Sequence, residues 1–362
     1  METLSFDVAI AGGGPGGSAT AISLLAHAPS LSVALIEASG YESYRVGETL
    51  PPPARALLEH LDAWASFKSQ RHQEAHGTSA AWGAAQPHHN DFFFMPNNVG
   101  WHLDRAAFDA MLADQARRRG ARLLLDTRVR DAQRSSEGWR LDLSNGDTIA
   151  ARFIVDATGS AALARRCGAR FIEADCLVGI AGFFDHCNGD PRTLVEAFEH
   201  GWWYTAGLPE SRRIVICMTD ADVARHLRMH ETKEWRRAVA AMCHVGARVG
   251  KSDVAEKVLV RSASSRRLDP SAGLDWLAVG DSVSRFDPLS SQGIVKALRS
   301  GIFASYAIGD LLERGDRDGL KRYGRYVEEE FQSYAETRQK YYREEQRWPA
   351  SEFWRRRQLL SA

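Results

Sequence analysis

The chain has 362 residues, of which 44% are hydrophobic and 25% are charged. The length suits about two domains. The composition is typical of a globular protein and excludes a disordered or low-complexity chain. Lysine plus arginine and aspartate plus glutamate each number 46, so the formal net charge is zero. A nucleic-acid-binding protein normally carries a basic surplus, so the composition argues against that class as well.

Neither a membrane span nor a disulfide framework is expected. The sequence has no run of 18 apolar residues, and the first charges of its apolar N-terminus are the acids Glu2 and Asp7 rather than the basic residues of a signal peptide. The cysteines are odd in number and form no C-x-x-C pair, which argues against structural zinc and disulfides. They are Cys167, Cys176, Cys187, Cys217 and Cys243. We therefore expect a cytoplasmic protein.

The first 36 residues have the pattern of a β-α-β unit. Residues 6–11 (FDVAIA) form a short apolar run that ends at glycines, as a buried parallel strand does. A helical pattern covers Ser18 to about His27, and a second strand pattern covers Ser32 to Ile36. Such a unit indicates an α/β fold with a parallel sheet.

Strand and helix patterns continue along the chain. Residues 104–119 begin with an acidic N-cap and stop at Gly120, which predicts a helix. The stretches 122–130 and 139–143, and then TIAARFIVDATG, predict strands that lead into a tight glycine turn. The middle, about 171–262, is rich in strand-like runs and has no nucleotide motif.

The C-terminal third predicts one more strand and long helices. Residues 276–282 (WLAVGDS) are an apolar strand that ends in Gly-Asp, and a helix pattern runs from about Gln292 to Arg314. A charged helical pattern follows from Leu320 to Gln358, interrupted at Pro349. Its aromatic residues indicate one buried or partner-facing side. They are Tyr334, Tyr341, Tyr342, Trp348, Phe353 and Trp354.

The strongest motif is G-x-G-x-x-G, formed by Gly12, Gly14 and Gly17 between the first strand and the first helix. The first glycine allows a tight turn, the second lets a pyrophosphate approach the backbone, and the third lets the helix pack closely on the strand. Glu37 ends the second strand 20 residues after Gly17, where an acid binds the ribose hydroxyls of the adenosine. A purely structural glycine turn is the alternative interpretation.

Three later elements distinguish FAD from NAD. They are Arg105 at the start of a helix, D-A-T-G at Asp156–Gly159, and the pair Gly280 and Asp281. In this order the motifs resemble the FAD-binding set of the p-hydroxybenzoate-hydroxylase-like flavoproteins, over essentially the whole chain. The resemblance implies bound FAD and an α/β p-hydroxybenzoate-hydroxylase-like (GR2) FAD-binding fold, with an inserted antiparallel β-sheet substrate domain and a helical C-terminal cap.

The resemblance also implies a division of the chain and a set of residues that bind FAD. The FAD-binding domain would comprise residues 1–78, 101–170 and 270–310. The substrate domain would comprise 79–100 and 171–269, and the C-terminal helical region 311–362. The FAD-binding residues would be Gly12, Gly14, Pro15, Gly16, Gly17, Glu37, Arg45, Gly47, Glu48, Thr49, Arg105, Val129, Asp156, Gly159, Gly280, Asp281, Pro288, Ser291, Gln292, Gly293 and Ile294.

Two segments are similar to flavin-dependent halogenases but lack the halogenase side chains. Arg45–Pro53 (RVGETLPPP) resembles their VGES-type segment, and Gly201–Pro209 (GWWYTAGLP) takes the place of their W-x-W-x-I-P signature without matching it. The stretch Gly77–Gly83, which corresponds to the halogenase lysine segment, has no lysine. Ser290 stands where the halogenases have a glutamate beside the halide. Halogenation is therefore disfavoured.

Other segments are similar to the flavoproteins that mature tryptophylquinone cofactors, the LodB, GoxB and QhpG type. They are Asp287–Gly301, Gly100–Arg105, Gly201–Pro209 and the tail R-W-P-x-x-x-F-W-R-x-R. In that group the substrate is a tryptophan of a partner protein. The Pro288–Ile294 turn would bring backbone N–H groups to the flavin at a helix N-terminus, which stabilises negative charge on the reduced flavin.

The resemblance implies an FAD-dependent monooxygenase that hydroxylates an electron-rich aromatic ring, such as the indole of a tryptophan in a partner protein or peptide. Oxygen and a flavin C4a-hydroperoxide would carry the chemistry, and electrons would come from NAD(P)H or from a separate flavin reductase. Three alternatives stay open: a reductase like the geranylgeranyl reductases, a halogenase, and a non-catalytic FAD-binding maturation subunit. No nucleic-acid partner is expected, because the charge is balanced. No metal is expected either, because adjacent histidines such as His88 and His89 usually point apart.

The pocket candidates are Trp202, Trp203, Tyr204 and His102. On a strand, alternation puts Trp202 and Tyr204 on one face and Trp203 on the other. We expect Trp202 and Tyr204 to form an aromatic wall beside the substrate and Trp203 to lie in the core; a purely structural cluster is the alternative. His102 is a candidate acid/base or supporting residue.

Overall fold

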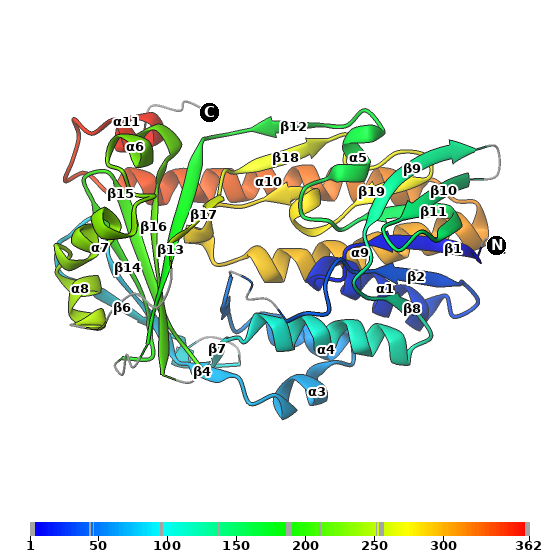
Figure 1. Ribbon diagram of the computed structural model, residues 1–362, viewed down its shortest axis with the longest axis horizontal. Helices are drawn as coiled ribbons and strands as arrows, with labels where there is room; N and C mark the ends of the chain where they lie inside the picture. Colours follow the sequence, from blue (N-terminus) through cyan, green and yellow to red (C-terminus); the bar gives the residue numbers. More distant parts are fainter. Residues whose placement is uncertain are drawn as a thin grey trace.

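The computed structural model describes residues 4–42, 45, 47–94, 97–135, 138–185, 190–209, 211–250, 252 and 257–358. Val46 of the R-V-G-E-T segment and Cys187 lie outside the described residues. The described chain forms two large sheets, two small sheets and a long C-terminal helix that runs past both large sheets (Figure 1). The predicted α/β class with a separate sheet and a helical C-terminal region is confirmed.

The first large sheet carries the glycine-rich loop. Its strand order is β8-β2-β1-β11-β10-β9, and β19 pairs in parallel with the end of β11. The central strands β8, β2, β1 and β11 are parallel, as the β-α-β pattern predicts. The strands are β1 (Leu4–Ala11), β2 (Val33–Ile36), β8 (Arg122–Leu124), β9 (Val129–Ser135), β10 (Gly138–Leu143), β11 (Thr148–Asp156) and β19 (Trp276–Ala278).

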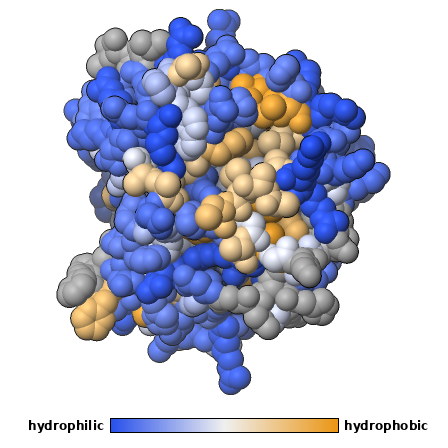
Figure 2. Space-filling model, turned by 90° about the vertical axis from the view of Figure 1, so that its left-hand side faces the viewer, coloured by the Kyte–Doolittle hydropathy of each residue, from blue (hydrophilic) through white to orange (hydrophobic). Residues whose placement is uncertain are grey.

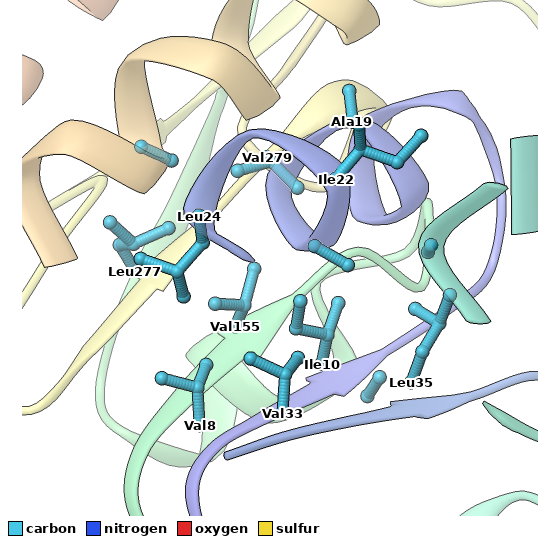
Figure 3. Close-up of a cluster of buried hydrophobic side chains, with 14 of the residues drawn as sticks. Val8, Ile10, Ala19, Ile22, Leu24, Val33, Leu35, Val155, Leu277 and Val279 are labelled. Atoms are coloured by element: carbon cyan, nitrogen blue, oxygen red, sulfur yellow. The ribbon is translucent and has the colours of Figure 1, made fainter. Parts of the chain in front are cut away.

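Apolar residues on the central strands form the core beneath α1 (Pro15–His27). Val8, Ile10 and Val155 have no exposed surface, and Figure 3 shows them packed beneath the helix. On its other side α1 contacts α9 (Gly293–Arg314) along its length, because a glycine lies at the crossing: a Cβ on Gly301 would come 2.4 Å from the carbonyl oxygen of Gly16. Small residues thus let the two helices approach and fix the loop that precedes α1.

The predicted strand 122–130 is wrong as a single element. It breaks into β8, which pairs with β2, and β9, which pairs with β10, so the two strands lie at opposite edges of the sheet. Asp126 has a φ of 51°, and the Thr127 amide donates to the Glu37 carbonyl at 2.9 Å. The break therefore brings Thr127 and Val129 beside the end of β2, where they line the cavity described below.

The second large sheet has the order β17-β13-β16-β15-β14-β5-β6. Its pairs are antiparallel, as expected, except that β5 and β14 are parallel. The strands are β5 (Gly77–Ala81), β6 (His88–Asp91), β13 (Leu177–Phe184), β14 (Thr193–Phe198), β15 (Gly201–Leu208), β16 (Arg212–Asp220) and β17 (Leu259–Ser262). One face of this sheet looks toward the first sheet, so the space between the two can hold a cofactor and a substrate (Figure 1). The domain limits inferred from the sequence stay a prediction.

The remaining elements connect or cover the two large sheets. The small sheets have the orders β3-β7-β4 and β12-β18-β20. Their strands are β3 (Thr49–Leu50), β4 (Gln73–Ala75), β7 (Gly100–His102), β12 (Arg170–Glu173), β18 (Arg266–Asp269) and β20 (Ser284–Arg285). The shorter helices are α2 (Ala54–His60), α3 (Trp64–Ser69), α4 (Arg105–Arg118), α5 (Ala162–Arg166), α6 (Ala221–His226), α7 (Thr232–Ala240) and α8 (His244–Val249), and the 3-10 turns are Phe92–Phe94, Gly280–Ser282 and Pro288–Ser290.

The C-terminal helices α10 (Asp318–Glu344) and α11 (Glu352–Gln358) join the two large sheets. The Tyr323 hydroxyl near the start of α10 donates to the Ala278 carbonyl of β19, in the first sheet. Near the other end of α10, the Tyr342 hydroxyl accepts a hydrogen bond from Trp202 in the second sheet. Of the aromatic residues predicted to share a buried side, Tyr334, Tyr342, Phe353 and Trp354 are buried, whereas Tyr341 is exposed.

The face of the molecule that carries α7 and α8 is mostly hydrophilic. Figure 2 views the end of the molecule that carries α7 and α8, where a limited patch of hydrophobic residues lies within a hydrophilic surround. Apolar surface of this kind is common on folded proteins. Within the described ranges, none of the helices combines the length and the apolar character that crossing a bilayer requires.

Candidate cofactor and substrate cavity

A cavity of about 860 Å³ lies between the two large sheets. Volumes of 300–1,000 Å³ are usual for small-molecule and cofactor sites. Most residues predicted to bind FAD converge on it, although they come from elements far apart in the chain. The ones that line the cavity are Gly12, Gly14, Pro15, Gly16, Glu37, Arg45, Gly47, Glu48, Thr49, Arg105, Val129, Gly159, Gly280, Asp281, Pro288, Ser291, Gly293 and Ile294.

The glycine loop leaves an open cradle in front of α1. Gly12 has a φ of +112°, and a Cβ there would come 2.2 Å from the Ala157 carbonyl oxygen. A Cβ on Gly17 would come 2.0 Å from the Gly12 carbonyl oxygen, so Gly17 does not line the cavity but permits close packing. A Cβ on Gly14 would meet no protein atom within 4 Å and would point into open space. The N-terminus of α1 is thus accessible to an anionic group.

Glu37 lies directly after β2, at the edge of the cavity. One of its carboxylate oxygens accepts from the Gly13 amide at 2.9 Å and thereby fixes the glycine loop. The other accepts from Arg45 and from Ser39, each at 2.7 Å. Glu37 is almost fully buried, so these hydrogen bonds hold it in one position facing the cavity.

Arg105 and Arg45 place two guanidinium groups on the cavity wall. Arg45 bonds Asp109 at 3.0 Å, and Arg105 reaches the same carboxylate at 3.1 Å and the Gly47 carbonyl at 3.0 Å. The Asp109 side chain has no exposed surface, so its charge is compensated by both arginines. Arginines fixed in this way are well placed to bind a pyrophosphate.

Asp156 organises the D-A-T-G loop rather than facing the cavity, which corrects its assignment as a direct ligand of the cofactor. One of its oxygens accepts from Thr158 and Ser282, and the other accepts from the amides of Leu163 and Ala164 at the start of α5. Gly159, at the end of the loop, does line the cavity.

Lys296 is a site residue that sequence reasoning missed. Its side chain has no exposed surface, and its ammonium group lies 2.9 Å from Asp281 and 3.2 Å from the Gly280 carbonyl, and also contacts the Ser284 carbonyl. The Asp281 side chain is 48% exposed, but it lines the cavity, so this surface opens inward. Burial raises the pKa of Asp281, but Lys296 and Arg285 outweigh it and hold the pKa below its usual value.

The Asp287–Ser291 turn closes one end of the cavity. Asp287 is fully buried, and its Oδ1 accepts from the Leu289 amide at 3.0 Å, which shapes the turn. Pro288, Ser291, Gly293 and Ile294 line the cavity, as predicted for residues near a flavin. Gln292 does not line this cavity but lines a depression beside α10, and its assignment to the cofactor stays a prediction.

The second sheet supplies the other half of the cavity, largely from small and apolar residues. Gly179, Ala181, Ile216 and Met218 line it from β13 and β16. The hydroxyl of Tyr204 in β15 shares a hydrogen bond of 2.6 Å with Thr49. Burial raises the pKa of Tyr204, and the nearby Glu48 raises it further, so the hydroxyl stays protonated at neutral pH.

The two neighbouring tryptophans do not line this cavity. Trp202 is fully buried against Trp82 and donates to the Tyr342 hydroxyl at 2.9 Å, so the prediction of a pocket pair with Tyr204 is wrong for Trp202. Alternation does put Trp202 and Tyr204 on the same face, but α10 covers that face at Trp202. Trp203 lies on the other face in a separate core, with its ring 5.7 Å from Trp235.

His102 is fully buried in β7 and does not line the cavity, so the expectation that it is a pocket residue is corrected. Its Nε2 bonds the Pro191 carbonyl at 2.8 Å. Burial lowers the pKa of His102, and Arg213 and Arg248 lower it further. The neutral imidazole therefore links β7 to the start of the 190–209 segment.

The cradle fits FAD. The open space at Gly14 and the N-terminus of α1 suit a pyrophosphate, the two arginines supply guanidinium donors, and Glu37 lies after the second strand as the adenosine ribose requires. The cavity continues from this cradle to the apolar face of the second sheet. One cavity can therefore hold the cofactor at one end and an aromatic ring at the other.

Comparison with known proteins agrees with this geometry. A family model for FAD dependent oxidoreductases matches residues 7–175. The FAD-dependent oxidoreductase LodB of Marinomonas mediterranea is 29% identical over 99% of this chain and 98% of its own length. The flavin-dependent halogenase gsfI of Penicillium aethiopicum is 24% identical over 86% of this chain and 66% of the halogenase.

Solved structures with the same fold include halogenases and a hydroxylase. The flavin-dependent halogenase CmlS matches with a TM-score of 0.86 and 25% identity over 100% of this chain and 68% of its own. The myxobacterial halogenase CndH matches with a TM-score of 0.91 and 21% identity over 99% and 87%. The peptidyl tryptophan dihydroxylase QhpG, essential for tryptophylquinone cofactor biogenesis, matches with a TM-score of 0.80 and 24% identity over 98% and 79%.

Proposed function

We propose that this chain, which matches the FAD-dependent oxidoreductase model over residues 7–175 and is similar to LodB over nearly its whole length, is a monooxygenase that hydroxylates the indole ring of a tryptophan in a peptide or partner protein. The reaction would use molecular oxygen and electrons from NAD(P)H or from a separate flavin reductase. The single observation that carries the proposal is the continuous cavity, with the cradle for FAD at one end and an apolar sheet face at the other.

The substrate half of this cavity suits a planar apolar ring. Gly179 and Ala181 leave room along β13, while Ile216 and Met218 supply apolar surface from β16. The Tyr204 hydroxyl is one polar group in this half, and it is held by Thr49. An apolar pocket with a few fixed polar groups orients an aromatic ligand through shape and one or two hydrogen bonds.

The chain's own residues bind, orient and exclude water. The glycine loop, Arg105 and Glu37 would hold the pyrophosphate and ribose of FAD, and the Asp287–Ser291 turn would hold its ring end. Bound FAD, once reduced, supplies the activation of oxygen. The indole ring is electron-rich by itself, so the protein need not supply a strong base; it must keep the ring in position and the site dry.

The relatives support a tryptophan substrate. QhpG, which has the same fold, is a peptidyl tryptophan dihydroxylase. The tryptophan of a polypeptide substrate would enter the cavity while the backbone stays outside. The enzyme would therefore need to contact that backbone at its surface. Whether one or two oxygen atoms are added would be decided by how the ring is seated.

Halogenation is the second candidate, and the halogenases among the relatives favour it. Against it, the described residues that line the cavity include no lysine. Lys296 lies beneath the cavity wall, but its ammonium group is fully engaged by Asp281, Gly280 and Ser284. It would have to break its ion pair with Asp281 and leave a fully buried position to act on a substrate.

The test is mass spectrometry of a tryptophan peptide after incubation with the FAD-loaded protein, a reductant and oxygen. A gain of ~16 or ~32 Da, located on the tryptophan, would support hydroxylation, since these are the masses of one and two oxygen atoms delivered by flavin chemistry. The Gly14→Val protein, which should lack FAD, is the control for uncatalysed oxidation. An unmodified peptide, or the same gain with the control, would contradict the proposal.

A further inference from the structure

We call the cavity between the two large sheets the FAD cavity. A second cavity, of about 870 Å³, lies beside it, and most of the charged residues that line this second cavity are arginines. Arg165 and Arg166 end α5, Arg170 begins β12, and Arg266 begins β18. Glu173 is the one carboxylate among the described residues that line it. We call this second cavity the arginine cavity.

The positive charge of the arginine cavity is only partly neutralised within the protein. Arg166 pairs with Asp131 at 2.9 Å. The guanidinium groups of Arg165 and Arg170 are exposed, and they make no hydrogen bond or ion pair with any other residue in the described ranges. A guanidinium group presents its donors in a planar fork that matches a carboxylate, so these two arginines are suited to an external acidic ligand.

The arginine cavity adjoins the FAD cavity. Ala162 lines both cavities. The Arg266 side chain lies flat on Phe171, 3.7 Å from its ring centre, and donates to the Gly159 carbonyl, and Gly159 lines the FAD cavity. A ligand bound in the arginine cavity would therefore lie next to a ligand that enters the FAD cavity.

The arrangement suits an extended chain better than one compact anion. The arginines are spread over α5, β12 and β18 instead of converging on one point. Among the described strands, β12 is the last of its sheet and pairs only with β18, and it exposes Ile172 by 49%. An edge strand offers free N–H and C=O groups to an extended peptide, and an exposed apolar side chain adds contact area.

We propose that the arginine cavity binds an acidic segment of the same polypeptide whose tryptophan enters the FAD cavity. The inference rests on the proposed function, and it identifies the substrate class as tryptophan with acidic neighbours. Arg165 and Arg170 bind carboxylates of that segment, while the free edge of β12 aligns its backbone. The arginines would select the substrate and raise its association rate without touching the reacting ring.

Three fluorescein-labelled peptides test this with the FAD-loaded protein. The first has one tryptophan followed by glutamates, the second has glutamines in place of the glutamates, and the third keeps the glutamates but has alanine in place of the tryptophan. Fluorescence anisotropy gives the affinity for each. At low salt we expect the glutamate peptides to bind about fivefold to tenfold more tightly than the glutamine peptide, and the preference to shrink as salt is added.

Matched double variants locate the effect. Arg165→Ala with Arg170→Ala should abolish the preference for glutamate. Arg225→Ala with Arg237→Ala should retain it, because these exposed arginines on α6 and α7 lie at the other end of the molecule (Figure 1). Arg165→Glu with Arg170→Glu should reverse the preference toward a lysine peptide, which a merely structural role would not produce.

Several outcomes would overturn the inference. Equal affinity for the glutamate and glutamine peptides would do so, as would a preference that survives in the Arg165/Arg170 variant. So would inorganic pyrophosphate that binds through these arginines while no peptide does. Hydroxylation of the tryptophan peptide without any preference for glutamate would overturn this inference alone, whereas intact preference without hydroxylation would refute only the proposed function.

Discussion

The Tyr342 hydroxyl donates a hydrogen bond of 2.8 Å to the Oδ2 of Asp287, and so ties the C-terminal helix α10 to the turn that closes the FAD cavity. The same hydroxyl accepts from Trp202 at 2.9 Å, and Arg338 adds a second bond to Asp287 at 3.0 Å. The Asp287 amide in turn donates to the hydroxyl of Tyr334, also from α10. The helix thus positions this turn from beneath, and Trp202 belongs to that support rather than to the substrate pocket.

Tyr342→Phe should lower both stability and FAD affinity. The change keeps the ring but leaves the Trp202 N–H without its partner and Asp287 with one bond fewer, which costs about 1–3 kcal/mol. Denaturant unfolding of the FAD-free protein measures the first effect, and titration with FAD measures the second. Tyr341→Phe is the matched control, because Tyr341 is 50% exposed. Equal behaviour of the two variants would contradict a positioning role for Tyr342.

Two glycines of the G-x-G-x-x-G motif should respond differently to substitution. Gly14 has a φ of −71° and open space in front of its Cα, so Gly14→Val should fold but fill the pyrophosphate space and lose FAD. Gly17→Ala should destabilise the fold itself, because its Cβ would come 2.0 Å from the Gly12 carbonyl oxygen. Flavin absorbance after gel filtration and thermal unfolding distinguish the two. A Gly14→Val protein that retains its flavin would refute the assignment of the cradle.

The parts of the site that could be predicted from the sequence are those whose chemistry is local. The glycine loop and Glu37 belong to one β-α-β unit, in which a fixed spacing places an acid beside the loop. Lys296 could not be predicted, because its ion pair with Asp281 depends on how α9 packs against the 3-10 turn at Gly280–Ser282.

The positions of Trp202 and Trp203 could also be predicted only in part. Strand alternation correctly separates Trp202 from Trp203, since it follows from the backbone alone. It does not say what covers each face along the strand. Here α10 and Trp82 cover the face at Trp202, and the cavity opens on that face only at Tyr204. The break of 122–130 into two strands is likewise decided by a tertiary contact, the bond from Thr127 to Glu37.

The aromatic run in β15 should divide into core and pocket. Trp203→Ala removes a fully buried ring and should cost about 3–5 kcal/mol of stability, and Trp202→Ala should behave in the same way. Tyr204→Phe should leave stability and FAD content nearly unchanged, yet lower hydroxylation of a tryptophan peptide at least about tenfold, because it removes the hydroxyl that we propose orients the ring. Full activity of the Tyr204→Phe protein would exclude it from the substrate pocket.

Chloride or bromide should not be incorporated. We expect no halogenated indole when either salt is added with a reduced-flavin supply, because the described cavity wall has no lysine to carry the halogen and Lys296 is engaged by Asp281. Mass spectrometry would detect chlorine or bromine by its isotope pattern. A regiospecific chlorotryptophan would favour the halogenase alternative over hydroxylation.

The ion pair of Lys296 with Asp281 should make stability depend on pH. The pKa of Asp281 is lowered in the folded protein, so its contribution is present above the unfolded value near 3.8 and is lost as the pH falls through the folded value. Lys296→Met removes the cation that lowers this pKa. At pH 7 we expect a loss of about 1–3 kcal/mol, kept modest because Asp281 opens into the cavity and can be hydrated. The difference in stability from the unmodified protein should narrow below pH 4, as Asp281 becomes protonated in both proteins.

Urea unfolding of the FAD-free protein at pH 7 and at pH 3 measures this difference, with Lys321→Met as the control. Lys321 forms an exposed pair with Asp318, so its loss should change little. A Lys296→Met deficit of the same size at both pH values would show that the lysine contributes by packing alone.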